Sequence, residues 1–280
     1  MSLRGGVKPS PLDIKGGVAV YKTYEFTFAG EPASMFGMFV ADLGNKSHTD
    51  NPFGNVANIV ETRLPNRVTP LHFGVRYHDS PLTFKLIFGS DHYLDRYQFQ
   101  EISNWLTGYQ EYQWLTIDQP DMEHIQFKCL IKDLSPISIR WFPNSFEATV
   151  VCDCAYGYSY PWEKTLSVNG SLKTVFYNDS TIRENLKPDL TIQLESGTRN
   201  FSITNKTTGT VMKFTGLPAG GVTIIADNEN GILRDGNDEY DLYDYFNFQF
   251  FELASGDNEL VFEGNGSVKI SGRYLYNVGA

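Results

Sequence analysis

The chain has 280 residues, enough for one large or two ordinary domains, and 41% hydrophobic against 20% charged residues argues against intrinsic disorder. Its net charge of −10 argues against a nucleic-acid binder, because neutralising phosphates requires a basic patch. Aromatic residues make up 14% of the chain, and such side chains favour β structure.

The N-terminal stretch, residues 1–23, predicts an arm without a core of its own, because it carries two Gly-Gly pairs and scattered prolines and lysines. No apolar segment precedes the first strand, so no secretory signal is expected. No stretch approaches the 18 apolar residues of a membrane span, and no polybasic run would hold an anionic membrane surface.

Alternating apolar residues bounded by turn residues predict strands through the first half of the chain. Leu71 and Phe73, for example, share one face of a strand, with His72 on the other. The predicted strands are residues 24–28, 71–77, 82–88, 112–118, 124–132, 137–141 and 146–154.

One segment, residues 96–107, has helical periodicity instead. Its recurring apolar residues are Phe99, Ile102, Leu106 and Tyr109. Trp105 and Leu106 are the expected anchors of this helix on the core, and Gly108 is placed to end it. The sequence therefore predicts a β-rich N-terminal domain, residues 24–160, with a single helix.

The second half predicts a domain made only of strands, residues 168–280. Residues 155–170, which include Asn169-Gly170, lack alternation and indicate a connection between the domains. Asn230-Gly231 and Asn265-Gly266 predict hairpins, because Asn-Gly readily adopts a type I′ turn. So many short strands indicate a β-sandwich or jelly roll. The predicted strands are residues 172–177, 190–194, 200–204, 210–214, 222–226, 245–253, 259–263 and 267–274.

Three cysteines cannot form a disulfide framework. Cys129, Cys152 and Cys154 continue the apolar faces of predicted strands, so they are interpreted as small core residues. A zinc half-site at Cys152 and Cys154 is the alternative, although no second ligand pair lies at usable spacing.

Catalytic motifs are not evident, and neither a metal nor another cofactor is predicted. The histidines are dispersed, and His72 and His124 lie opposite the apolar faces of their strands, which favours solvated or interface roles. Residues 227–231 resemble a calcium loop only superficially, because Gly231 falls one place early. Among 33 acidic residues some pair could satisfy glycosidase geometry, but spacing cannot single one out.

An acidic, tyrosine-rich stretch at residues 238–245 is the most distinctive local feature. Tyr240, Tyr243 and Tyr245 could stack on sugars while neighbouring carboxylates accept hydroxyl hydrogen bonds. The alternative is a loop that leads into an edge strand and whose charges prevent aggregation.

Two sets of segments resemble distal tail proteins (Dit) of long-tailed phages. An aromatic strand ending in a small turn, a helix closing on Trp105-Leu106, and a strand entering an Asp/Pro turn are similar to the family's N-terminal domain. The closing Leu-x-x-Gly-x-Asn-x-Leu motif and the Gly-rich segment after it resemble the family's C-terminal domain. The segments are residues 24–30, 102–106, 115–121 and 127–131, then 203–209, 225–233 and 251–260.

The resemblance implies a structural tail-tip hub and not an enzyme. Six copies would form a ring through their N-terminal domains, between the tail tube protein and the tip and receptor-binding proteins. Galectin-like C-terminal domains would project outward, where partners or host glycans dock. Such a protein would be assembled in the host cytoplasm and end in the virion tail. A carbohydrate-binding module, and then a glycosidase, are the alternatives.

Overall fold

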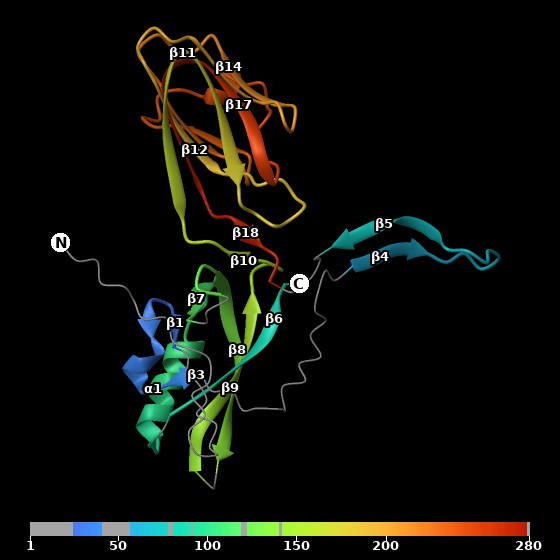
Figure 1. Cartoon of the computed structure of the whole chain (residues 1–280), viewed down its shortest axis with the longest axis vertical. Coiled ribbons are helices and arrows are strands. Elements are labelled where there is room, and N and C mark those ends of the chain that lie inside the picture. The colour runs from blue at the N-terminus through green and yellow to red at the C-terminus, as the bar shows by residue number, and fades with distance from the viewer. Residues whose placement is uncertain are drawn as a thin grey trace, which may run out of the picture. The chain divides into compact units, whose positions relative to one another are not determined.

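The computed structural model describes residues 25–40, 57–77, 81–90, 92–118, 122–139 and 142–278. The chain divides into two compact units, Met1–Glu123 with Phe127–Ala155, and His124–Gln126 with Tyr156–Ala280. Among the described residues, strands dominate both units and a single α-helix lies in the first, so the predicted mainly β fold is confirmed (Figure 1). The predicted arm, residues 1–23, and two histidines, His48 and His78, lie outside the described residues.

The first unit is built on one sheet with the strand order β2-β1-β7-β8-β9-β6-β3. A separate two-stranded sheet contains only β4 and β5. The elements are β1 (Phe26–Phe28), β2 (Glu31–Pro32), η1 (Ala33–Phe36), β3 (Phe39–Val40), β4 (Ala57–Thr62), β5 (Leu71–Tyr77), β6 (Thr83–Gly89), α1 (Arg96–Thr107), β7 (Gln113–Ile117), β8 (Gln126–Ile139) and β9 (Phe142–Cys152).

Helix α1 has the predicted bounds and ends at Gly108 as expected. Asp95 begins it with a capping box, accepting from the backbone N–H of Gln98 while the Gln98 side chain accepts from Asp95 N. The buried residues are Ile102, Trp105 and Leu106, so the predicted anchors face the core. The helical spacing of the apolar residues thus predicts both that this segment is a helix and which of its faces packs on the core.

Strand β8 corrects the prediction of two strands at residues 124–132 and 137–141. It is continuous and pairs with β9 along most of its length. The register shifts between Ile131 and Asp133 and again between Ile137 and Ser138. Each bulge resets the alternation of side chains, so one irregular strand has the sequence pattern of two.

The second unit has a seven-stranded arrangement in the order β14-β13-β17-β12-β15-β16, with β11 also paired to β17. The two-residue strands β10 and β18 pair with each other. The elements are β10 (Gly157–Tyr158), β11 (Trp162–Asn178), β12 (Asp189–Leu194), β13 (Asn200–Asn205), β14 (Thr210–Thr215), β15 (Thr223–Asp227), β16 (Ile232–Asp235), η2 (Leu242–Tyr245), β17 (Gly256–Gly272) and β18 (Leu275–Tyr276).

Strands β11 and β17 form one long antiparallel pair that serves both halves of this unit. The first part of β17 also pairs with β13, and its last part pairs with β12. Side chains from both halves share one core cluster, including Phe201 and Phe262 from one half and Ile192 and Ile224 from the other. The unit is therefore a β-sandwich whose two layers share a strand pair.

The junction between the two layers corrects two predictions. Residues 162–170, expected in a connection, lie in β11, and Asn265-Gly266 forms no hairpin but lies within β17. Gly170, Gly264 and Gly266 have positive φ angles of 76°, 131° and 154°. The Asn265 side chain accepts from Gly170 N at 2.7 Å across the pair. Asn-Gly here lies at a bend in a continuous strand, where Gly266 but not Asn265 has a positive φ. The other predicted hairpin, at Asn230-Gly231, is confirmed between β15 and β16.

Residues 245–253 were predicted as a strand and are not one. They follow η2 and make isolated bridges at Phe246 and Leu253. Buried asparagines hydrogen-bond this segment where neighbouring strands would otherwise do so. The bonds run from Asn178 Nδ2 to Leu253 O, from Asn205 Nδ2 to Glu252 O and from Phe251 N to Asn228 Oδ1.

Candidate functional site

The tyrosines of the acidic, tyrosine-rich segment, residues 238–245, differ in their contacts and in their exposure. Tyr243 donates a hydrogen bond to Gly231 O and accepts one from Leu233 N, so its hydroxyl anchors η2 to β16. Tyr245 is half-buried against the core of the sandwich, whereas Tyr240 is 38% exposed. The three predicted contact residues therefore differ in exposure, Tyr240 being the most exposed, and the segment leads into η2.

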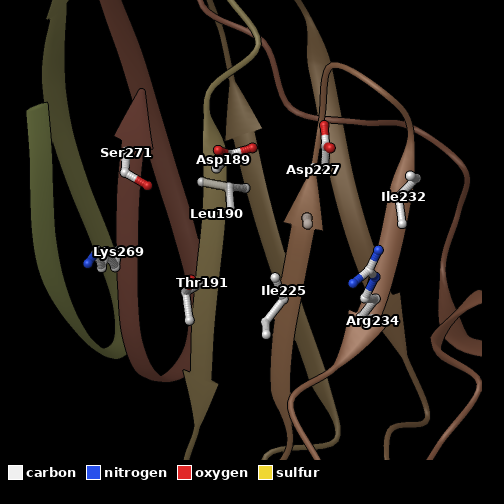
Figure 2. A pocket seen from close by; sticks show the side chains of 10 residues that line it. Asp189, Leu190, Thr191, Ile225, Asp227, Ile232, Arg234, Lys269 and Ser271 are labelled. Atoms are coloured by element: carbon white, nitrogen blue, oxygen red, sulfur yellow. The ribbon is translucent and has the colours of Figure 1, made fainter. Parts of the chain in front are cut away.

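A pocket of about 420 Å³ lies on the outer face of β12, β15, β16 and β17 (Figure 2). Strand registers arrange its side chains in two rows across the four strands. One row is Ser271, Asp189, Asp227 and Ile232, and the other is Lys269, Thr191, Ile225 and Arg234. We name this surface the four-strand pocket. Its volume falls within the roughly 300–1,000 Å³ typical of ligand sites.

Two carboxylates lie directly opposite each other in the four-strand pocket, because Asp189 and Asp227 continue the register of β12 and β15. Burial, and then the charge of Asp227, raise the pKa of Asp189. Hydrogen bonds from Asn230 lower the pKa of Asp227, which accepts from Asn230 N at 2.9 Å and from Asn230 Nδ2 at 2.7 Å. Asp227 is thus held ionised beside a carboxyl group that resists ionisation.

The remaining side chains add cations and apolar surface to the four-strand pocket. Lys269 forms an ion pair with Glu163, while Arg234 has no hydrogen-bond or ion-pair partner within the part of the chain that the structure describes. Ile225 and Ile232 are 43% and 39% exposed. The sequence pattern does not reveal this surface, since only the register of four strands brings these residues together.

The β4–β5 hairpin presents an unusual amount of apolar surface. Phe73 is 66% exposed, Ile59 57%, Leu64 45% and Val68 103%. The predicted strand at residues 71–77 is confirmed, but Phe73 does not pack into a core. The hairpin is also basic, with three Arg against one Glu over residues 57–77, in a chain of net charge −10.

The cysteines and the histidines among the described residues do not converge on a metal site. Cys129 and Cys152 are buried directly opposite each other on β8 and β9, whereas Cys154 is half-buried beyond the end of β9. His72 is exposed on β5, and His124 lies edge-on to Tyr276. Within the described ranges, no three His, Cys, Asp or Glu side chains are grouped so that they could hold a metal ion.

Thiol reactivity follows from this placement. Burial, and then the charge of Asp153, raise the pKa of Cys129 to about 12, and burial also raises the pKa of Cys152. Both thiols stay protonated near neutral pH, and only the thiolate reacts. Iodoacetamide is expected to modify Cys154 in the folded protein while leaving Cys129 and Cys152 intact, as measured by peptide mass spectrometry. Equal modification of all three before denaturation would contradict this assignment.

Two family models together match most of the chain. One, described as the phage tail protein N-terminal domain, matches residues 21–154, and the other, the phage tail C-terminal domain, matches residues 156–272. The chain belongs to this phage tail protein family. No curated protein matches it. No helix in the described part of the chain is long and apolar enough to cross a membrane.

A solved structure shares the fold of this tail protein. The Dit protein (gp 19.1) of phage SPP1, described as a paradigm of the hub adsorption apparatus in phages infecting Gram-positive hosts, matches with a TM-score of 0.65 and 8% identity. The match covers 90% of this chain and 100% of SPP1 Dit. The activated baseplate of phage p2 also aligns, with a TM-score of 0.40, 10% identity, and coverage of 89% and 97%. The resemblance to distal tail proteins is confirmed by the family match and the SPP1 Dit fold.

Proposed function

We propose that this tail protein forms a ring of six copies that joins the tail tube to the tip and receptor-binding proteins. The N-terminal domain, residues 24–160, makes the ring, and the C-terminal domain, residues 168–280, projects outward as a galectin-like sandwich. Assembly takes place in the host cytoplasm, and the finished ring is part of the virion tail. The hub is structural and not an enzyme. Its family membership and the SPP1 Dit fold support this role.

The β4–β5 hairpin is the observation that favours self-association. A lone two-stranded hairpin is marginally stable in water, and two unpaired strand edges invite pairing with another chain. Among the described residues, β4 and β5 pair only with each other. The hairpin carries a charge of +2, from three Arg and one Glu, so the rest of the chain carries −12. The net negative charge of a second copy therefore attracts a basic, apolar hairpin.

Replacing Phe73 with aspartate tests this proposal. The charge would face an apolar contact, so we expect the association between copies to weaken at least tenfold. Sedimentation of the full chain at high concentration, with negative-stain images of the particles, measures the change. The matched control is Val175→Asp on β11, where the side chain is 55% exposed on the other unit.

The expected pattern is rings from the wild-type chain and from Val175→Asp, and single copies from Phe73→Asp. If Phe73→Asp formed the same rings as the wild-type chain, the hairpin would not be part of the interface between copies. Closed particles containing a number of copies other than six would correct the proposed symmetry.

A further inference from the structure

We propose that Cys129 and Cys152 close a cross-strand disulfide, and that Cys154 is the thiol through which an oxidant reaches them. The oxidant is a small-molecule disulfide such as oxidised glutathione. All three residues lie on β8, on β9 or directly after β9, within one unit of the chain. The inference therefore goes beyond ring formation and does not require it.

The backbone register places the first two cysteines opposite each other. Cys129 and Cys152 are partners in the antiparallel pair of β8 with β9. Cys152 N donates to Leu82 O at 2.8 Å, so its backbone points away from β8. The pair is therefore of the non-hydrogen-bonded kind, in which the Cα atoms lie about 4.5 Å apart and the side chains approach most closely. Disulfides span Cα separations of about 4.4–6.8 Å, so the backbone need not move.

The surroundings hold both thiols in this arrangement. Cys129 and Cys152 are each 0% exposed, in a core that also buries Phe127. On the other side of the same two strands, Asp153 N donates to Lys128 O at 2.9 Å, and the two side chains form an ion pair at 4.0 Å. A close-packed core and a fixed register leave the two sulfur atoms little freedom to turn apart.

Burial also means that an oxidant cannot meet these two thiols directly, whereas Cys154 is half-buried at the end of β9. Leu82 N donates to Cys154 O at 2.9 Å, so Cys152 and Cys154 both hydrogen-bond Leu82 and their side chains lie on the same face. Burial first, and then the thiolates of Cys129 and Cys154, raise the pKa of Cys152. The three sulfur atoms are thus within interaction range of one another, in the order 129, 152, 154.

Three thiol–disulfide exchanges would transfer the bond inward. The Cys154 thiolate attacks one sulfur of oxidised glutathione, forms a mixed disulfide and releases one glutathione. Cys152, after losing its proton, attacks the Cys154 sulfur and releases the second glutathione. Cys129 then attacks the Cys152 sulfur, which forms the cross-strand bond and restores the Cys154 thiol. Two electrons and two thiol protons pass from the protein to the two glutathione molecules.

Geometry gives the exchange its direction. Residues two apart on one strand have Cα atoms roughly 6.7 Å apart, at the upper limit for a disulfide. The bond between Cys152 and Cys154 is therefore strained, and the bond between Cys152 and Cys129 is not. Proximity within the folded chain offsets the small fraction of buried thiolate, because each inward step is intramolecular.

The bond would stabilise the longest strand pair of the N-terminal unit. It closes a loop around the 22 residues between the two cysteines, which restricts the unfolded chain. It also lies beside the first register shift of the pair, between Ile131 and Asp133. Given the proposed function, the bond would stay open in the reducing host cytoplasm and close after the virion leaves the cell.

Peptide mapping of the full chain after incubation with oxidised glutathione tests the proposal. Cleavage before Asp153 places Cys152 and Cys154 on different peptides, so mass spectrometry without reduction identifies each bond. We expect Cys129 to be linked to Cys152, and the melting temperature of the N-terminal unit to rise by about 5 °C or more over the dithiothreitol-treated chain. Cys154→Ser should form the same bond at least tenfold more slowly, and Cys129→Ala should show no rise.

Four outcomes would overturn the assignment. They are a bond between Cys152 and Cys154, glutathione retained on Cys154, a Cys154 link between two copies, and an unchanged rate of closure in Cys154→Ser. The Phe73→Asp chain should close the same bond as a single copy. Failure of the ring proposal and failure of this one are therefore separate results.

Discussion

Replacing Trp105 with alanine is expected to lower the free energy of unfolding of the N-terminal unit by about 3–5 kcal/mol. Trp105 is 7% exposed, and its ring stacks on Phe36 at 4.3 Å and on Phe26 at 5.6 Å between centroids. Its indole N–H also donates to Phe28 O at 3.2 Å. The substitution therefore leaves a large cavity and removes a buried hydrogen bond in the same place.

Hydrogen-exchange mass spectrometry on the full chain measures this effect, because it reports on each unit separately. Protection should fall in α1, β1 and β7, and stay unchanged in β12 and β17. Tyr97→Ala is the matched control, since Tyr97 lies on the same helix and is 82% exposed. A Trp105→Ala chain protected as strongly as the control would show that the helix anchor was misassigned.

The helix was predictable because its determinants are local. Apolar residues at helical spacing, with Gly108 after them, specify α1 without reference to the rest of the chain. Strands with clean alternation, such as β5 and β12, were found for the same reason. Within this family the ordered set of such elements was enough to indicate the phage tail fold.

Elements that depend on distant partners could not be predicted. Residues 245–253 alternate enough to suggest a strand, but Asn178, Asn205 and Asn228 hydrogen-bond their backbone from elsewhere in the sequence. The four-strand pocket has the same origin, because Asp189 and Asp227 meet only through the pairing of β12 with β15. Alternation shows which residues face outward but does not show which outward residues are neighbours.

The Asn-Gly bend in β17 shows how a local signal can be interpreted wrongly. The Asn265-Gly266 pair indicates a positive φ angle at the glycine. Both a tight turn and a bent strand can require such an angle. Only the partner strand distinguishes them. Here β11 stays in register with β17 from Trp162 to Asn178, so the chain bends without reversing.

Replacing Gly266 with alanine is expected to cost the C-terminal unit about 2–4 kcal/mol of unfolding free energy. A Cβ atom at Gly266 would lie 2.3 Å from Gln193 O and 3.0 Å from Leu194 Cα, which are backbone atoms of the paired strand β12. Its φ of 154° also disfavours a side chain. The strand pair must therefore separate or straighten where the two layers of the sandwich meet.

Gly256→Ala provides the matched control for this bend. Gly256 also has a positive φ, 83°, but a Cβ there would meet nothing within 4 Å. It should cost only about 1 kcal/mol, the backbone strain alone. Chemical denaturation of the full chain, with exchange protection followed in β12 and β17, separates the two variants. If both variants lost the same stability, the close approach of β12 to Gly266 would not be what requires glycine there, and conformational freedom alone would explain the residue.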